Sequence, residues 1–285
     1  MPSFGLGTWQ QRDPSTVKRV VRQALDAGYR LIDTASAYRN ETAIGSALAE
    51  TFADSASGLC RKDVWITSKL SPKQQGFEGA TTAVLQSLRS LQTDYIDLYL
   101  IHWPGISGRP PVSTEHRLRR KESWRALEKL YSQGKVRAIG VSNYTSMHLK
   151  EMEEYAEVMP MVNQCELHPL CPQTDLLQYC QSNGIVFTAY ASLGEGLLLD
   201  RDARTFPQLD AIATRRPDLT KAQILLLWAL QHDIAVIPKA SSTGRLHENI
   251  GVFGKDILSS DEILELGSVS PQLYVRYCWN PEQVA

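Results

Sequence analysis

The sequence lacks an excess of charge of either sign. Its 285 residues contain 30 lysines and arginines against 31 aspartates and glutamates, which gives a formal net charge of −1. Proteins that bind nucleic acids or anionic membranes through charge carry a clear basic surplus. We therefore expect no nucleic acid and no membrane surface as the principal partner.

Cysteine is scarce and irregularly placed. The number of cysteines is odd, and no two of them are spaced as C-x-x-C. Disulfide frameworks and zinc sites need even numbers or regular spacings. We therefore expect a reduced, intracellular protein with no bound metal. The cysteines are Cys60, Cys165, Cys171, Cys180 and Cys278.

Long hydrophobic runs and a leader segment are also missing. The longest apolar run, 224–230, is far shorter than the roughly 20 residues that span a bilayer. The first residues, Met-Pro-Ser-Phe-Gly, do not combine basic and apolar character as a secretory signal does. These observations predict a cytoplasmic protein.

A regular alternation of short apolar runs and amphipathic segments fills nearly the whole chain. Such alternation is typical of βα units in a parallel sheet. Eight strands would close into a single (β/α)8 TIM barrel over residues 1–285, a size that suits one such domain. The expected strands end near Asp33, Lys69, His102, Ser142, Gln164, Tyr190 and Lys239, with a weaker eighth at Gly251 to Phe253.

Helix signals and loop lengths complete this pattern. Asp13-Pro14 should open the first helix and Gly28 should close it, while a helix over Ser123 to Tyr131 should stop at Gly134. Two longer stretches, 105–121 and 193–219, follow strand ends directly. In a barrel they would be loops at the mouth, where substrate choice usually lies.

Four polar residues sit at or just beyond predicted strand ends: Asp33, Tyr38, Lys69 and His102. In a parallel barrel these ends converge on one mouth, so we expect the four side chains to form a proton-delivery site. Taken singly, each has a plainer explanation. The aspartate could cap a helix, the tyrosine could roof the barrel, and the lysine could be a Schiff-base nucleophile as in barrel lyases. The histidine could be a structural residue.

The same strings, in the same order, resemble the aldo-keto reductase family over essentially the whole chain. The motifs are Gly5-Leu-Gly-Thr-Trp9, Asp33-Thr-Ala-Ser-Ala-Tyr38, Ser68-Lys69-Leu70, Asp97-Leu-Tyr-Leu-Ile-His102-Trp-Pro104, Gly140-Val-Ser-Asn143, Asn163-Gln164 and Ile237-Pro-Lys239. The resemblance implies a barrel enzyme that reduces carbonyl groups with a nicotinamide cofactor. Members of this type usually begin with a β-hairpin under the barrel, which this chain lacks or has only in shortened form.

The chemistry of carbonyl reduction gives each of the four residues a role. Tyr38 would be the general acid, and the Lys69 ammonium would lower the pKa of its phenol from about 10 toward the working pH. Asp33 would hold Lys69 charged and in place. His102 would hydrogen-bond the carbonyl oxygen, orient the substrate or pass a proton to Tyr38, three roles that the sequence does not separate.

The resemblance implies a cofactor lying across the barrel mouth, and no G-x-G-x-x-G follows the first strand to suggest a Rossmann site. Lys239, Ser241 and Arg245 would hold a 2′-phosphate at a helix start, which favours NADPH over NADH. Ser142, Asn143, Gln164 and Tyr190 would contact the nicotinamide end, and Glu248 and Asn249 the adenine end. Further cofactor contacts are expected from Thr8, Trp9, Asp33, Ala191, Ser192 and Leu193.

An apolar slot at the mouth would take an aldehyde or ketone. Its walls are expected to be Trp9, Tyr38, His102, Trp103 and Trp279, whereas Trp65 and Trp228 should be core residues. The basic run 117–121 is interpreted as a solvated loop and helix start. The chain is expected to be a monomeric enzyme. The alternatives are a barrel lyase and a cofactor-sensing or structural barrel protein with little turnover.

Overall fold

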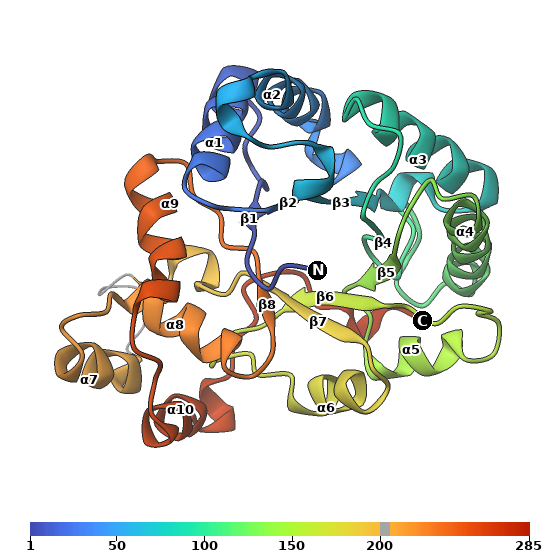
Figure 1. Ribbon diagram of the computed structural model, residues 1–285. Helices are drawn as coiled ribbons and strands as arrows, with labels where there is room; N and C mark the ends of the chain where they lie inside the picture. Colours follow the sequence, from blue (N-terminus) through green and yellow to red (C-terminus); the bar gives the residue numbers. More distant parts are fainter. Residues whose placement is uncertain (200–205) are drawn as a thin grey trace.

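The computed structural model describes residues 1–199 and 206–285. Within these residues, eight parallel strands follow one another around the sheet in chain order (Figure 1). Each strand is paired with the next one along the chain, as βα units require. The strands are β1 (Leu6–Gly7), β2 (Leu31–Asp33), β3 (Trp65–Leu70), β4 (Leu98–Ile101), β5 (Ile139–Ser142), β6 (Val162–Glu166), β7 (Val186–Tyr190) and β8 (Ala235–Val236).

Helices surround this sheet on its outer side (Figure 1). The predicted (β/α)8 barrel is therefore confirmed. The helices are α1 (Pro14–Asp26), α2 (Glu41–Ala53), α3 (Phe77–Ser90), α4 (Glu115–Ser132), α5 (Ser146–Met152), α6 (Thr174–Ser182), α7 (Pro207–Arg215), α8 (Lys221–Leu230), α9 (Thr243–Ile250) and α10 (Ser260–Gly267).

The seam between β1 and β8 closes the barrel through isolated bridges, from Phe4 to Val236 and from Gly7 to Lys239. Gly5 N donates to Val236 O at 2.9 Å across the same seam. A Cβ on Gly5 would lie 2.0 Å from Leu31 Cδ2, and one on Gly7 would lie 2.5 Å from a backbone oxygen. Gly7 therefore lets the two strand backbones approach each other, and Gly5 leaves room for the Leu31 side chain of β2.

The eighth strand was predicted in the wrong place. Gly251–Gly254 is a 3-10 turn that continues α9, and its apolar character is explained by the burial of Val252 in the core. The missing strand is β1, which is too short to show a period-two pattern. Five residues precede β1, and the described residues there form no hairpin.

The helix boundaries confirm some expectations and correct others. Asp13 accepts a hydrogen bond from Thr16 N and opens α1, and Gly28 follows its end with a φ of 99°. The predicted helix 123–131 is only part of α4, which begins at Glu115 and absorbs the end of the expected loop 105–121.

Within the second expected loop, 193–219, the structure has a 3-10 turn at Gly194–Gly196 and the helix α7. Positions 200–205 of that loop lie outside the described residues. The proline at the first position of α7 suits a helix start and is the sequence signal that the loop prediction overlooked.

The basic run 117–121 was interpreted as solvated, and this is wrong for Arg120. That side chain is fully buried on α4, where it is paired with Glu151 and donates to Pro104 O at 3.1 Å. Trp228 is a core residue as predicted, and Trp65 packs, partly buried, against the interior cluster of Leu98 and its neighbours.

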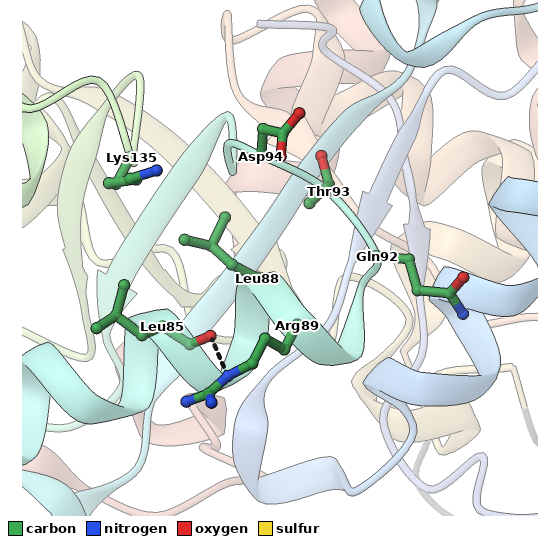
Figure 2. Close-up of a pocket in the computed structure, with 7 residues that line it drawn as sticks. All are labelled: Leu85, Leu88, Arg89, Gln92, Thr93, Asp94 and Lys135. Atoms are coloured by element: carbon green, nitrogen blue, oxygen red, sulfur yellow. Dashed lines mark hydrogen bonds between the residues drawn. The ribbon is translucent and has the colours of Figure 1, made fainter.

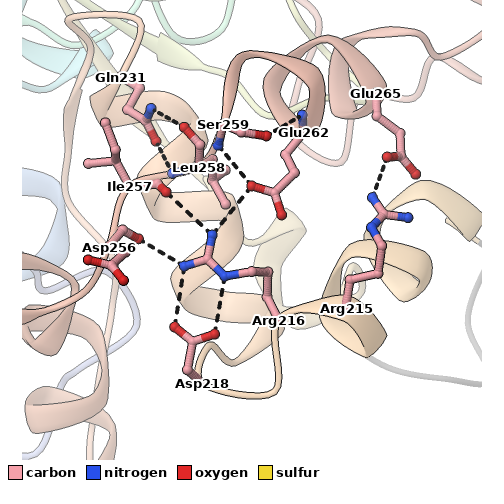
Figure 3. Close-up of polar contacts among 10 residues, drawn as sticks. All are labelled: Arg215, Arg216, Asp218, Gln231, Asp256, Ile257, Leu258, Ser259, Glu262 and Glu265. Atoms are coloured by element: carbon pink, nitrogen blue, oxygen red, sulfur yellow. Dashed lines mark hydrogen bonds and ion pairs between the residues drawn. The ribbon is translucent and has the colours of Figure 1, made fainter.

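A polar cluster joins α7 to the segment before α10 (Figure 3). Arg216 contacts Asp218 and Glu262 and donates to Ile257 O and Asp256 O. Gln231 hydrogen-bonds Leu258 in both directions at 2.9 Å. These bonds fix the chain between α9 and α10 against α7 and the end of α8.

No helix among the described residues is long and apolar enough to cross a membrane. The same residues contain no group of three or more histidine, cysteine or acidic side chains that could hold a metal ion. The five cysteines are free thiols, and Cys165, Cys171 and Cys180 are buried.

Glu41 is a buried carboxylate outside the barrel interior, in the first turn of α2. It accepts a hydrogen bond from Ser68 Oγ at 2.6 Å and has no described cation beside it. Burial raises its pKa, and the hydrogen bonds from Ser68 and Ser87 offset that only in part. The folded state therefore binds the Glu41 proton more tightly than the unfolded chain does.

We expect Glu41→Gln to stabilise the protein at pH 7–8. Because the folded pKa is raised, the contribution of Glu41 is fully present below the unfolded pKa and is lost as pH rises through the folded pKa. The amide avoids this loss, so the free energy of unfolding should rise by about 1–3 kcal/mol near pH 7, with little gain near pH 4. Urea denaturation at the two pH values measures this.

Glu78→Gln is the matched control, because Glu78 is an exposed acid in the first turn of α3. It should change stability by less than about 0.5 kcal/mol at both pH values. An equal effect of the two substitutions would show that burial of the Glu41 carboxylate does not lower the free energy of unfolding.

Candidate active site

Three of the four predicted site residues come from adjacent strands, and the fourth from the turn that follows the first of these strands. Asp33 ends β2, Lys69 lies in β3 and His102 directly follows β4. The register pairs Asp33 with Thr67 and Lys69 with Leu100, so these side chains reach the same end of the barrel. Tyr38 lies in the 3-10 turn Ser36–Tyr38, which Ser36 Oγ ties to Lys69 O at 2.9 Å.

Lys69 and Asp33 form a buried ion pair. The Lys69 ammonium donates to Asp33 Oδ1 and, at 2.9 Å, to Thr34 O. Lys69 is fully buried and Asp33 is 2% exposed. Burial lowers the pKa of Lys69, but the charges and hydrogen bonds of Asp33 and Tyr38 together outweigh burial, so the net shift is upward and the amine stays charged.

Tyr38 stands beside this pair. Its ring centroid is 5.2 Å from Lys69 Nζ, and its hydroxyl is 3.5 Å from His102 Nε2. That last distance is at the limit of a hydrogen bond, as catalytic contacts often are before a ligand binds. The ring also packs against Trp9, with centroids 4.8 Å apart.

The protonation states follow from this environment. Burial raises the pKa of Tyr38 and Lys69 lowers it, and the net direction is upward. The expectation that Lys69 brings this pKa below its ordinary value is therefore wrong for the free protein, in which Tyr38 is a protonated phenol. Burial, with help from Lys69, lowers the pKa of His102 to about 3, so its imidazole is neutral.

Gln164 of β6 binds the Asp33 carboxylate of the ion pair, a contact that the sequence did not predict. Gln164 Nε2 donates to Asp33 Oδ2 at 2.7 Å, across the barrel from β6 to β2. Each carboxylate oxygen of Asp33 thus has its own donor. Only the closed barrel brings positions 33 and 164 together, so no local signal could have shown this bond.

Other residues predicted to contact the cofactor form hydrogen bonds around Gln164, Asp33 and His102. Asn143 donates to His102 O at 3.0 Å and accepts from the Tyr190 hydroxyl at 2.6 Å. Ser142 Oγ donates to Gln164 O at 2.7 Å. Thr8 Oγ1 donates to Asp33 O at 2.9 Å. The predicted set is therefore brought together and already hydrogen-bonded in the free protein.

The turn after β7 carries Ala191, Ser192 and Leu193, also predicted near the cofactor. Ala191 has a φ of 50°, a strained conformation for a residue with a side chain. Ser192 is buried and its hydroxyl donates to Ala189 O at 3.3 Å.

The predicted phosphate residues lie across the β1–β8 seam, at the start of α9. Lys239, Ser241 and Arg245 are exposed, and neither cation pairs with a described carboxylate. Ser242 caps α9 by accepting from Arg245 N. Arg19, which the sequence did not single out, donates to Ser241 O at 3.4 Å. Asn249, predicted near the adenine, is buried, and Glu248 is half-buried on the same helix.

Aromatic side chains surround the mouth. Trp9 is 44% exposed beside Tyr38, and Trp103 packs against Trp279 with ring centroids 5.8 Å apart. Trp279 is 79% exposed, so much of its surface is available to a ligand. The four strand ends, the cations and these rings share one end of the barrel.

A hollow of about 540 Å³ lies at the other end of the strands (Figure 2). It lies beside the chain that leads into β4 and β5, and none of the predicted site residues belongs to it. Its lining is Leu85, Leu88, Arg89, Gln92, Thr93, Asp94 and Lys135. It is not the candidate site, because the polar groups that could move a proton converge on the opposite end.

Comparison with known proteins agrees with this geometry. Residues 3–270 match the model of the Aldo/keto reductase family. The chain is 41% identical to "Glyoxal reductase" of Bacillus subtilis over 92% of this chain and 86% of that protein. It is 40% identical to "9,11-endoperoxide prostaglandin H2 reductase" of Trypanosoma cruzi over 89% and 82% of the two chains.

A solved structure, the aldose reductase of Giardia lamblia, superposes with a TM-score of 0.86 at 34% identity, covering 97% of this chain and 94% of that one. Fold and site together define a barrel oxidoreductase. The chain belongs to the aldo-keto reductase family, whose members reduce carbonyl compounds with a nicotinamide cofactor.

The buried ion pair gives a stability prediction. Asp33→Asn and Lys69→Met should each lower the free energy of unfolding by about 3–5 kcal/mol, because each leaves the partner buried without its counter-charge. The double variant should lose less than the sum of the two, since no unpaired charge remains. Denaturant unfolding of the four proteins measures the coupling. Strict additivity would show that the two charges do not depend on each other.

Proposed function

We propose that this protein reduces aldehydes and ketones to alcohols with hydride from NADPH, and that Tyr38 is the general acid. The observation that carries the proposal is the position of the Tyr38 phenol between the buried Lys69–Asp33 pair and the neutral imidazole of His102. A carbonyl oxygen at this point would meet both a proton donor and a hydrogen-bond donor.

Tyr38 carries its proton in the free protein, so it is ready to act as an acid. As the phenol gives its proton to the carbonyl oxygen, negative charge appears on the phenolate. The Lys69 ammonium is already close to the ring and stabilises this charge as it develops, without reorganisation. Asp33 keeps Lys69 charged and fixed, and Gln164 in turn holds Asp33.

His102 acts as a neutral hydrogen-bonding group. With a pKa lowered to about 3, its imidazole is uncharged at physiological pH. A neutral imidazole is a poor acid but a good donor of one hydrogen bond to a carbonyl oxygen. This favours the orienting role among the three considered for His102 and leaves Tyr38 as the proton source.

Bound NADPH supplies the hydride. The described residues suit such a group at both ends. Lys239 and Arg245 are exposed cations without a described carboxylate partner, beside the capped N-terminus of α9, where an anion is favoured. At the other end, Gln164, Asn143 and Ser142 offer amide and hydroxyl groups to a carboxamide. A 2′-phosphate would use the two cations, which supports NADPH over NADH.

The aromatic wall supports substrates with an apolar or aromatic body. Trp9 packs on the Tyr38 ring, and Trp103, which follows His102, packs on Trp279; all three rings are exposed or half-exposed and form the aromatic wall. The similar proteins named for glyoxal and for prostaglandin H2 differ widely in the size of their substrates, so small and large carbonyl compounds are both suitable tests. The cytoplasmic location and the monomeric state stay predictions.

The lyase alternative is disfavoured by the state of Lys69. A Schiff-base nucleophile needs a neutral amine, whereas Lys69 is held charged by Asp33 and is fully buried. In the cofactor-sensing or structural alternative, the protein would bind the cofactor but reduce carbonyl compounds little, so the turnover assay distinguishes it from a reductase.

The decisive variant is Tyr38→Phe. It should lower kcat for a benzaldehyde by at least about 100-fold, the usual contribution of a general acid, while NADPH binding changes little. Loss of NADPH absorbance measures turnover, and fluorescence titration measures binding. Tyr95→Phe is the matched control, since Tyr95 precedes β4 at the opposite end of the barrel and the variant should keep near wild-type turnover. Full activity of Tyr38→Phe would refute the assignment.

Arg245→Ala tests the cofactor choice. If Arg245 contacts a 2′-phosphate, the Kd for NADPH should rise by about tenfold or more, whereas the Kd for NADH should change by less than about twofold. Arg125→Ala, which removes an exposed arginine of α4, should leave both values unchanged. Equal weakening of the two cofactors would remove the argument for a phosphate contact.

A further inference from the structure

The end of the chain crosses the barrel mouth as a strap, residues 271–285. It begins beside the turn after β6, where Val275 N donates to Leu170 O at 2.8 Å. It ends against the loop after β4, where Ala285 N donates to Pro111 O at 2.8 Å. The strap has little regular structure, with 3-10 turns at Pro271–Leu273 and Pro281–Gln283. Side-chain contacts must therefore hold its middle in place.

One buried carboxylate, that of Glu166, makes the central contact. Glu166 is the last residue of β6 and is fully buried. Its Oε1 accepts from Tyr277 N at 2.7 Å, and its Oε2 accepts from Cys278 N at 3.0 Å. His168 Nε2 lies 3.1 Å from Oε1. Two consecutive backbone amides of the strap thus bind one side chain of the barrel.

These bonds keep Glu166 charged. Burial would raise its pKa, but the hydrogen bonds from His168 and from the two strap amides outweigh that effect and lower it. Hydrogen bonds to an ionised acceptor are about twice as strong as neutral ones. A single carboxylate therefore fixes the backbone at 277–278, where the strap makes no strand or helix.

The anchored residues 277–278 directly precede Trp279, one of the rings of the aromatic wall. Trp279 follows Cys278 and packs on Trp103, the neighbour of His102. On the other side, Cys278 Sγ is 3.9 Å from Glu195, in the turn after β7. The position of Glu166 therefore determines where the wall stands relative to the phenol.

We propose that Glu166 is a positioning residue for substrate selection, which holds Trp279 at the mouth by binding the backbone of the strap. It contacts neither of the reacting atoms and acts through Trp279. Large aromatic carbonyl compounds that reach the wall depend on this anchor, whereas small ones reacting at Tyr38 do not. The inference rests on the proposed reductase function for its activity readout.

The test uses Glu166→Gln, which keeps the shape but leaves one acceptor oxygen for the two strap amides. The ratio of kcat/KM for 2-naphthaldehyde to that for propanal, with NADPH, should fall by roughly tenfold, the scale of a lost pocket contact. Trp279→Ala should lower the ratio similarly. The double variant should fall no further than either single variant, because both changes remove the same wall.

A second readout does not depend on activity. Amide hydrogen exchange at 277–278 should accelerate in Glu166→Gln, because both of these amides donate their hydrogen bonds to the Glu166 carboxylate. Glu128→Gln is the matched control, because Glu128 Oε1 also accepts from two backbone amides, those of Glu157 and Val158, far along α4 from the mouth. It should alter neither the ratio nor the exchange at 277–278. Glu166→Asp, which keeps the charge but shortens the reach, should act in the same direction as Glu166→Gln.

The outcomes separate the two hypotheses. If the wild type reduces neither aldehyde, the proposed function fails, and the exchange experiment alone decides whether Glu166 anchors the strap. If the wild type is active, an unchanged ratio in Trp279→Ala overturns the inference, as does unchanged exchange in Glu166→Gln. An equal loss for both aldehydes in Glu166→Gln also overturns it, since that would indicate general damage to the barrel.

Discussion

The buried ion pair of Lys69 and Asp33 is the interaction on which the rest of the site depends. Two charges without water are tolerated only where each has its partners, and here the barrel supplies them from Thr34 and Gln164. The pair fixes the end of β3 against that of β2 and sets a positive charge beside Tyr38. The acidity of the phenol and the neutrality of His102 both respond to that charge.

Strand β6 carries two side chains that bind different parts of the protein, the ion pair and the C-terminal strap. Gln164 and Glu166 are two residues apart, so they emerge on the same face. The first reaches Asp33 at the centre, and the second, one step nearer the rim, reaches the strap. The candidate site residues and the outer aromatic wall are therefore both attached to one rigid strand, which limits how far either can shift relative to the other.

The sequence was sufficient for the barrel and for the grouping of Asp33, Tyr38, Lys69 and His102, because strand ends in a parallel barrel must converge. It failed where information is not local. The two-residue β1 has no period to detect, and Val252 looked strand-like because it packs into the core. The bonds from Gln164 to Asp33 and from Glu166 to Tyr277 span 131 and 111 residues, so only the folded chain reveals them. Burial also reversed the expected direction for the pKa of Tyr38.

The glycine-lined seam between β1 and β8 has a consequence of its own. It is joined by isolated bridges and backbone hydrogen bonds, with no side chain at Gly5 or Gly7. Trp9 lies on one side of this seam and Lys239 on the other. A ligand that contacts both edges holds them together, so its binding free energy adds to the stability of the folded barrel.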